Sequence, residues 1–226
     1  MKFKQDPHYM NISEMFCWIL AIFFYFLAIW VFPFMPEEVA THWNALGQVD
    51  GHTGRFLATF MLPYLATIMF ILFVTIPRID PLKNNIKKFR VHFDGFIMLL
   101  MMFLLYLFLL VISWNLGQIF DMGQVLSPAF AILIYYCGIL IENAKMNWFI
   151  GIRTPWTMSS ELVWKKTHVL GGKLFKISGV IAVLGIFEFY AIWLVIGPVV
   201  VSSIYAVVYS YFEFQRQAKK KKRKRR

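Results

Sequence analysis

Six long apolar stretches separated by short polar ones constrain what this chain can fold into. They span residues 15–34, 56–76, 95–114, 128–141, 174–196 and 199–214. An α-helix needs roughly 17–25 residues to cross about 30 Å of hydrocarbon, so the short fourth stretch is expected either to begin near Met122 or to tilt little. Only 15% of the residues are charged, whereas a soluble domain has about a quarter. The sequence therefore predicts an all-α polytopic membrane protein with six transmembrane helices.

The lysines and arginines alternate in their distribution between the polar segments. Of the 23 in the chain, all but Arg55 precede the first stretch, lie between the second and third, lie between the fourth and the start of the fifth, or follow the sixth. Loops rich in lysine and arginine stay in the cytoplasm. We therefore predict a cell-membrane protein with both termini cytoplasmic, an ordered extracellular loop at 33–56 and a cytoplasmic motif loop at 143–173.

The same pattern suggests two units and a basic tail. Residues 1–92 form a two-helix unit with the extracellular loop, and residues 93–226 form a four-helix unit with the motif loop. The tail at 216–226 ends in KKKKRKRR, and its expected partner is the anionic leaflet of the bilayer, at about 1 kcal/mol per basic residue near the surface. Direct binding to nucleic acid is not expected of such a tail on a multi-pass protein.

The extracellular loop at 33–56 is expected to contain a short helix followed by a turn. Pro36 suits a first helical position, and the two glutamates after it complement the positive end of a helix dipole. This helix would run to about Leu46 and end at Gly47. Trp43 is expected at the boundary between membrane and water.

The cytoplasmic loop at 143–173 is expected to form a rigid turn followed by a short helix. Gly151 and Pro155 interrupt any helix that enters the loop, and the residue before a proline is pushed toward an extended conformation. One of the serines at 159–160 caps the new helix, and the glycine pair at 171–172 ends it.

Side chains of this second loop have both structural and functional interpretations. Arg153 can bind a phosphate or a carboxylate, or it can pair with Glu142 or Glu161 and fix the loop, and we favour this pairing. Trp156 and Trp164 are expected to anchor the segment at the membrane interface.

Candidate catalytic and metal-binding groups lack the spacing that such chemistry needs. His42, Asp50 and His52 are ordinary zinc ligands by type, but they match no established spacing. The loop at 143–173 contains serine, glutamate and histidine, yet Glu161 and His168 lie two turns apart and nothing marks an oxyanion hole. We therefore predict no catalytic residue, no bound metal, no cofactor and a protein that is not an enzyme.

Glu188 is the clearest ionisable residue inside an apolar stretch. It lies about fourteen residues into the fifth stretch, or roughly 21 Å along a helix, in the outer half of the bilayer. A carboxylate there is costly, so we expect it to face the bundle interior with Arg55 or Asn115 as a partner. It is either a protonated hydrogen-bonding group or a functional acid.

Two long motifs resemble a known family. NWFIGIRTPWTMSSELVWKKTHVLGG, residues 147–172, is similar to the signature of the SdpI family of bacterial membrane proteins. VATHWNALGQVDGHTGRF, residues 39–56, resembles the uncharacterised domain that commonly precedes it. In the cytoplasmic motif the matching residues are Gly151, Arg153, Pro155, Trp156, Trp164 and His168. In the extracellular motif they are Pro36, His42, Trp43, Asn44, Gly47, Asp50 and Gly51.

This resemblance implies a membrane protein like the immunity protein that protects a toxin-producing cell from its own secreted killing peptide. In that system the protein also holds a helix-turn-helix repressor at the membrane when toxin is present. The expected function is therefore immunity or signal transduction, with a secreted toxin peptide as the outer partner and a repressor as the inner one. The alternative is a small-solute transporter or channel built around Glu188.

The predicted orientation is tested by labelling single cysteines with a membrane-impermeant reagent. Gln48→Cys is expected to react in intact cells, and Ser159→Cys is expected to react only after permeabilisation, because basic loops remain inside. The parent chain, which keeps Cys17 and Cys137 inside apolar stretches, gives the background. The reverse labelling pattern would contradict the orientation.

Overall fold

The computed structural model describes residues 12–187 and 191–224, with side chains to residue 220. Within these ranges, six helical segments are long and apolar enough to cross a membrane. They are built from α1 (Ile12–Val31), α2 (Arg55–Ile79), α4 (Arg90–Asn115), α5 (Met122–Asn143), α7 (Glu161–Ala182) and α8 (Ala191–Lys224). Shorter elements are η1 (Phe32–Phe34), β1 (Glu38–Trp43), β2 (Val49–Gly54), α3 (Lys83–Ile86), η2 (Lys87–Phe89), α6 (Pro155–Met158) and η3 (Val183–Ile186). The predicted all-α fold with six spans is confirmed, including the start of the fourth at Met122.

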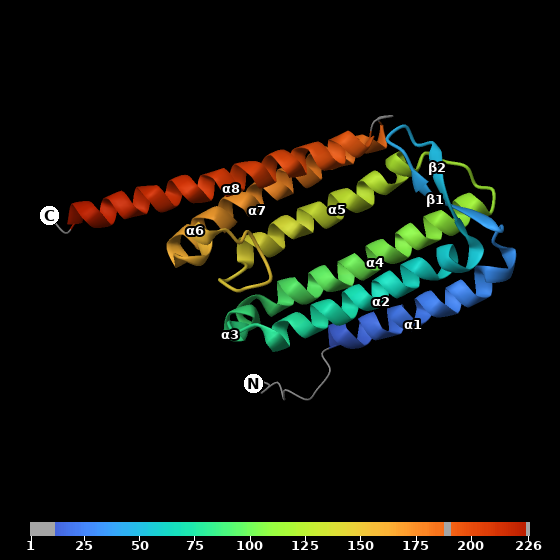
Figure 1. The fold of residues 1–226 in the computed structure, drawn as a ribbon, viewed down its shortest axis with the longest axis horizontal. Helices are drawn as coiled ribbons and strands as arrows, with labels where there is room; N and C mark the ends of the chain where they lie inside the picture. The colour runs from blue at the N-terminus through green and yellow to red at the C-terminus, as the bar shows by residue number, and fades with distance from the viewer. Residues whose placement is uncertain (1–11, 188–190, 225–226) are drawn as a thin grey trace.

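The long helices form two groups of three (Figure 1). Helices α1, α2 and α4 pack on one another, as do α5, α7 and α8, and α4 contacts α5 between the groups. The packing thus places α4 with the first two helices, whereas the sequence division at residue 92 assigns most of it to the second unit.

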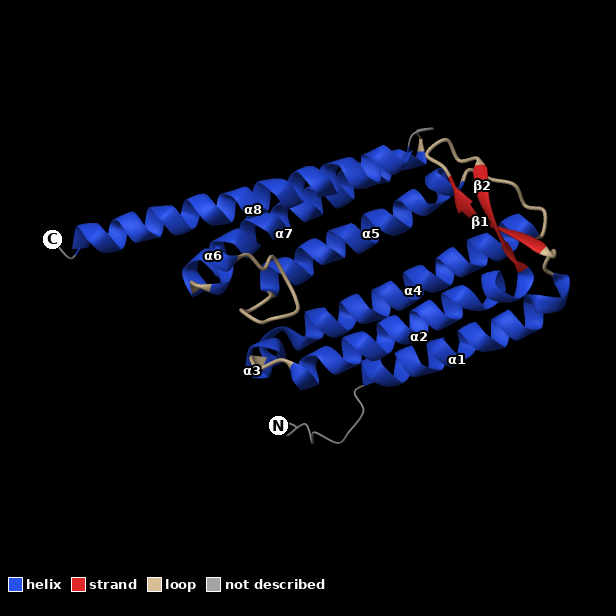
Figure 2. Ribbon diagram, viewed as in Figure 1, coloured by secondary structure: helices blue, strands red, loops and turns tan. Residues whose placement is uncertain are grey.

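The bundle has two different ends. The strands β1 and β2 lie together at one end, which we call the hairpin end (Figure 2). Helices α3 and α6, the start of α1 and the end of α8 lie at the other, which we call the basic end because it carries the loops rich in lysine and arginine. The sequence pattern predicts that the basic end is cytoplasmic.

Helix α7 corrects the expectation that a glycine pair ends the helix of the second loop. It begins at Glu161 and continues through Gly171 and Gly172 to Ala182. A Cβ on Gly172 would lie 2.7 Å from the carbonyl oxygen of Gly138 in α5, and one on Gly179 would lie 2.8 Å from that of Ala131. Here glycine allows two helix backbones to approach closely, as is common in membranes.

The boundary between the last two spans is also corrected. The expected spans at 174–196 and 199–214 place it near Pro198, but η3 ends at Ile186, α8 begins at Ala191, and Pro198 lies inside α8. Because α7 already begins at Glu161, the chain has reached a spanning length by Ile186. Glu188 falls outside the described residues.

A buried ionic network joins the three helices of the first group at the basic end. Glu14, only 7% exposed, binds Arg90 at 2.8 Å and Arg78 at 3.4 Å. Arg90 also binds Asp94 at 2.5 Å. Both carboxylates of this network therefore have a cationic partner, which stabilises a charge removed from water. Asp94, which needs no special role by sequence alone, belongs to this network.

Gly172→Ala is expected to destabilise the protein by about 1–3 kcal/mol, because a methyl group would meet rigid backbone and push α5 and α7 apart. Gly197→Ala is the matched control, since nothing lies within 4 Å of its Cβ position in α8. Thermal unfolding of the purified protein in detergent measures both. Equal melting temperatures for the two variants would contradict the close helix contact.

Candidate functional site

The segment between α5 and α7, residues 144–160, is organised around one buried asparagine. Asn147 is 0% exposed and donates from Nδ2 to the carbonyls of Lys145 (2.8 Å) and Ile150 (2.9 Å). Its Oδ1 accepts from the backbone N–H of Phe149 (2.9 Å) and Ile150 (2.7 Å). This side chain thus supplies the partners that the irregular backbone lacks. We call residues 144–160 the platform.

The platform turns at Gly151 against His168 of α7. Gly151 has φ +115°, and a Cβ there would collide with His168 Nε2, so both conformation and space require glycine. The backbone N–H of Ile152 donates to Nε2 at 3.0 Å. Nδ1 therefore carries the proton and donates to the Trp164 carbonyl at 2.8 Å. In this arrangement His168 is neutral and acts as a structural bracket.

Trp164 completes this bracket. Its ring stacks on that of His168 with centroids 3.8 Å apart, and its Nε1 donates to the carbonyl of Ala144 at 2.9 Å. Trp164 is only 3% exposed, so it is not the interfacial anchor expected from the sequence. The buried indole is stabilised because its ring packs against His168 and its N–H donates a hydrogen bond.

Helix α6 is fixed by its first residues. Thr154 and Thr157 form a capping box, in which Thr154 Oγ1 accepts from Thr157 N at 3.1 Å and Thr157 Oγ1 accepts from Thr154 N at 2.9 Å. Pro155 occupies the first turn, where its missing N–H costs nothing. The predicted turn is therefore present, and these hydrogen bonds fix its backbone at the start of α6.

The platform and the start of α7 dock on α8. Thr154 and Ser210 share a hydrogen bond of 3.0 Å between their hydroxyls, and Trp156 packs edge-on against Tyr211 at 5.1 Å. Further contacts are Ser160 Oγ to Gln217 Oε1 at 3.1 Å and Lys166 Nζ to Glu213 Oε1 at 2.5 Å. Ser160 also caps α7, as one of the two serines was expected to do.

Arg153 differs from its expected arrangement. Its side chain is exposed and donates from Nη1 to the Trp148 carbonyl within the platform. Among the described residues it forms no salt bridge, and Glu142 instead binds Lys176 at 2.5 Å. The favoured pairing with Glu142 or Glu161 is therefore wrong, because the turn brings a carbonyl closer to Arg153 than either carboxylate.

Two residues that the sequence reasoning missed join the α2–α4 connection to the platform. Asp80 is 2% exposed and accepts from the N–H of Leu82 at 2.5 Å and of Trp148 at 2.9 Å. Asn85 donates from Nδ2 to the Met146 carbonyl at 2.8 Å. The only local signal is an aspartate before a proline, which is typical of a turn.

At the hairpin end, the expected short helix from Pro36 to Leu46 is wrong. Strands β1 and β2 pair antiparallel, from Glu38 opposite Gly54 to Trp43 opposite Val49. The connecting turn is set by Asn44, whose Oδ1 accepts from the N–H of Leu46 (2.8 Å) and Gln48 (3.1 Å). Gly47 follows with φ +70°. Alternating β-branched and aromatic residues in VATHW favour this strand over a helix.

Asn115, at the end of α4, ties the hairpin to the bundle. Its Oδ1 accepts from the Ala40 N–H at 2.8 Å and its Nδ2 donates to the Ala40 carbonyl at 3.0 Å. Trp43 packs edge-on against Trp114 at 5.5 Å, and Arg55 Nε donates to the Pro36 carbonyl at 3.3 Å. Asn115 and Arg55, the expected partners of Glu188, thus both bind the hairpin.

Other residues of the extracellular motif shape the hairpin surface. His42 Nδ1 lies 2.5 Å from Asp50 Oδ1, and both side chains are well exposed. A Cβ on Gly51 would lie 2.8 Å from the His42 Cβ, and one on Gly47 would lie 2.5 Å from Asp121 Oδ2. Among the described residues, no group of three or more histidine, cysteine or acidic side chains is placed to hold a metal ion.

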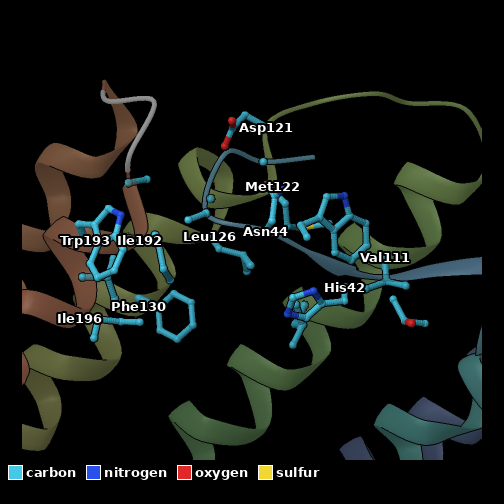
Figure 3. Close-up of a pocket in the computed structure, with 18 of the residues that line it drawn as sticks. His42, Asn44, Val111, Asp121, Met122, Leu126, Phe130, Ile192, Trp193 and Ile196 are labelled. Atoms are coloured by element: carbon cyan, nitrogen blue, oxygen red, sulfur yellow. The ribbon is translucent and has the colours of Figure 1, made fainter. Parts of the chain in front are cut away.

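A cavity of about 530 Å³ lies beneath the hairpin between the two helix groups. Its walls come from β1 and its turn, α2, α4, α5 and α8. In Figure 3, Trp193 and Ile196 lie on one side, Val111 and His42 lie on the other, and Phe130 lies between them. The lining is mainly apolar. No sequence pattern predicts it, because it is assembled from five separate elements.

Comparison with known protein families finds two matching segments. Residues 143–210 match the SdpI/YfhL protein family, and residues 18–67 match DUF1648, a domain of unknown function. The expected SdpI resemblance is confirmed. A curated relative, Immunity protein SdpI of Bacillus subtilis (strain 168), is 26% identical over 200 residues, covering 88% of this chain and 94% of the relative. No solved structure gives a significant match.

The two matches map onto the structure as follows. The SdpI/YfhL segment contains the platform, α7 and the first part of α8, whereas the DUF1648 segment contains most of α1, the hairpin and the first half of α2. The chain is thus a multi-pass protein of the cell membrane.

Asn147→Ala is expected to lower stability by at least about 2 kcal/mol, because buried N–H and carbonyl groups lose their partners. Asn143→Ala is the control, since Asn143 Nδ2 bonds only to the Ile139 carbonyl in its own helix. Limited proteolysis within the platform and thermal unfolding report the effect. Unchanged protection of the platform in Asn147→Ala would contradict its organising role.

Proposed function

We propose that this chain is a membrane immunity protein that protects its cell against a secreted toxic peptide. The observation that carries the proposal is the relative named Immunity protein SdpI, which aligns with 88% of this chain. Because the alignment is nearly full-length, it includes both the hairpin end and the basic end. The bilayer is the protein's surroundings, and the toxin is its outer partner.

The hairpin end is the proposed toxin-facing surface. On the orientation predicted by the charge pattern it lies outside the cell. There the paired strands give the hairpin a defined surface over the cavity and beside it. The motif residues on this surface are Pro36, His42, Trp43, Asn44 and Asp50. The two glycines of the motif, Gly47 and Gly51, allow the close approaches that keep this shape.

The platform is the proposed contact for a helix-turn-helix repressor in the cytoplasm. Gly151 and the buried side chains of Trp164 and His168 fix the backbone, while Arg153 stays exposed and bonded to a main-chain carbonyl. A rigid surface with an exposed guanidinium suits recognition of a carboxylate on a partner protein. Helix α8 runs on through Lys224, so the basic tail begins as a helix that reaches the anionic headgroups.

A small-solute transporter or channel built around Glu188 is the alternative, and no specific observation favours it. The cavity offers mainly apolar walls, whereas a polar solute crossing a membrane needs polar groups along its path.

Killing assays test the proposal. Deleting the gene is expected to make the host sensitive to its own culture fluid, and the intact chain is expected to restore growth. Arg153→Ala should still protect but no longer bring the repressor to the membrane fraction, because an exposed charge is lost without disturbing the fold. Lys165→Ala, which removes another exposed cation, is the control. If the cells are equally sensitive to the culture fluid with and without the chain, the proposed immunity function is wrong. If Arg153→Ala still brings the repressor to the membrane fraction, Arg153 is not part of the repressor contact.

A further inference from the structure

The cavity at the hairpin end has the position of a site that faces the outer leaflet. On α2 its lining residues are Ala58, Met61 and Leu62, within about 10 Å of the helix start at a rise of 1.5 Å per residue. On α5 the lining extends to Phe130, about 12 Å from the helix start. The cavity therefore reaches from the membrane surface into one leaflet.

The size and walls of the cavity fit an apolar ligand of moderate size. Its volume of about 530 Å³ lies within the range of about 300–1,000 Å³ typical of small-molecule sites. Leu126, Phe130 and Trp193 contribute apolar surface (Figure 3). An apolar side chain or chain segment that enters such a space leaves water or headgroups for a matching environment.

Polar groups occur where the cavity meets the hairpin. Asn44 and Asp121 line it there, and His42, another lining residue, is bonded to Asp50. Trp43 also lines the cavity, and its indole Nε1 is buried without a hydrogen-bond partner among the described residues.

Charge at the hairpin end favours a cationic peptide over an anionic lipid. Within residues 32–56 and 115–122, the acidic residues are Glu37, Glu38, Asp50 and Asp121, and the basic residue is Arg55. Such a surface attracts cations and repels anionic phospholipid headgroups. An occupant with apolar side chains and an adjacent positive charge matches both the apolar walls and the acidic residues at the hairpin end.

We propose that this cavity binds an apolar segment of a peptide that carries flanking basic residues, with the apolar side chains inside and the cations beside Asp121 and Asp50. This inference rests on the proposed function and deepens it, because it names the chemical class of the toxin segment and where it binds. The two helix groups, which the hairpin bridges at Gly47 and Asp121, form the opposite walls of the site.

A binding assay with the purified full-length chain in phosphatidylcholine nanodiscs tests this. The probe is a fluorescent synthetic peptide of leucines flanked by lysines, and the same peptide flanked by glutamates is its charge control. The lysine peptide should bind at least about tenfold more tightly than the glutamate peptide. Leu126→Trp, which fills the cavity, should weaken binding about tenfold, since bulk replaces the space for the ligand.

Matched variants separate binding from folding. Ile132→Trp places the same ring on α5 at a position 59% exposed and outside the cavity, and it should bind like the parent chain. Ile196→Trp fills the cavity from α8. If one of the two filled variants does not fold, binding is measured with the other. Asp121→Asn keeps the cap of α5, because asparagine also caps helices, but should weaken binding of the lysine peptide about threefold.

Three results would overturn the inference. The first is equal binding of the two peptides, and the second is unchanged binding when folded Leu126→Trp and Ile196→Trp are used. The third is copurification of phosphatidylglycerol with the parent chain but with neither filled variant. A lipid would then be the occupant of the cavity. The killing assay separates this inference from the proposed function: a chain that protects cells without binding the lysine peptide here keeps the function and loses the site.

Discussion

Every feature of this protein depends on one constraint: backbone N–H and carbonyl groups in hydrocarbon must find partners within the protein. Six helices meet that constraint through their own hydrogen bonds. All strands, turns and short helices that the structure describes are therefore confined to the two ends of the bundle. The ends differ because one has a strand pair and the other has loops with most of the basic residues.

At each end, an asparagine side chain replaces missing backbone partners. Asn115 binds both main-chain groups of Ala40, and Asn147 binds four main-chain groups of the platform. A primary amide suits this task because it offers two donors and an acceptor in one plane. The proposed outer and inner contact surfaces are thus rigid for the same chemical reason.

The two helix groups are held differently at the two ends. At the basic end, Asp80 and Asn85 of one group bind the platform of the other through main-chain groups. At the hairpin end, a mainly apolar cavity lies between the groups and the hairpin covers it. Beside the cavity, Tyr106 Oη of α4 donates to the Val125 carbonyl of α5 at 3.0 Å. A ligand in the cavity would touch both groups, while the platform at the far end belongs to the second group.

The amino-acid sequence by itself determined the number of spans, the alternation of basic loops and the turn at Gly151 and Pro155. These follow from hydropathy, charge and backbone restrictions, which act locally. The residues of VATHW favour a strand, but only the tertiary structure decided that this strand is fixed to the bundle, because its attachment to Asn115 joins residues distant in sequence. It also decided that Gly171 and Gly172 pack against α5 rather than end α7, since a glycine's role depends on which backbone lies opposite it. The cavity belongs to this second class, because five elements contribute walls that no single segment encodes.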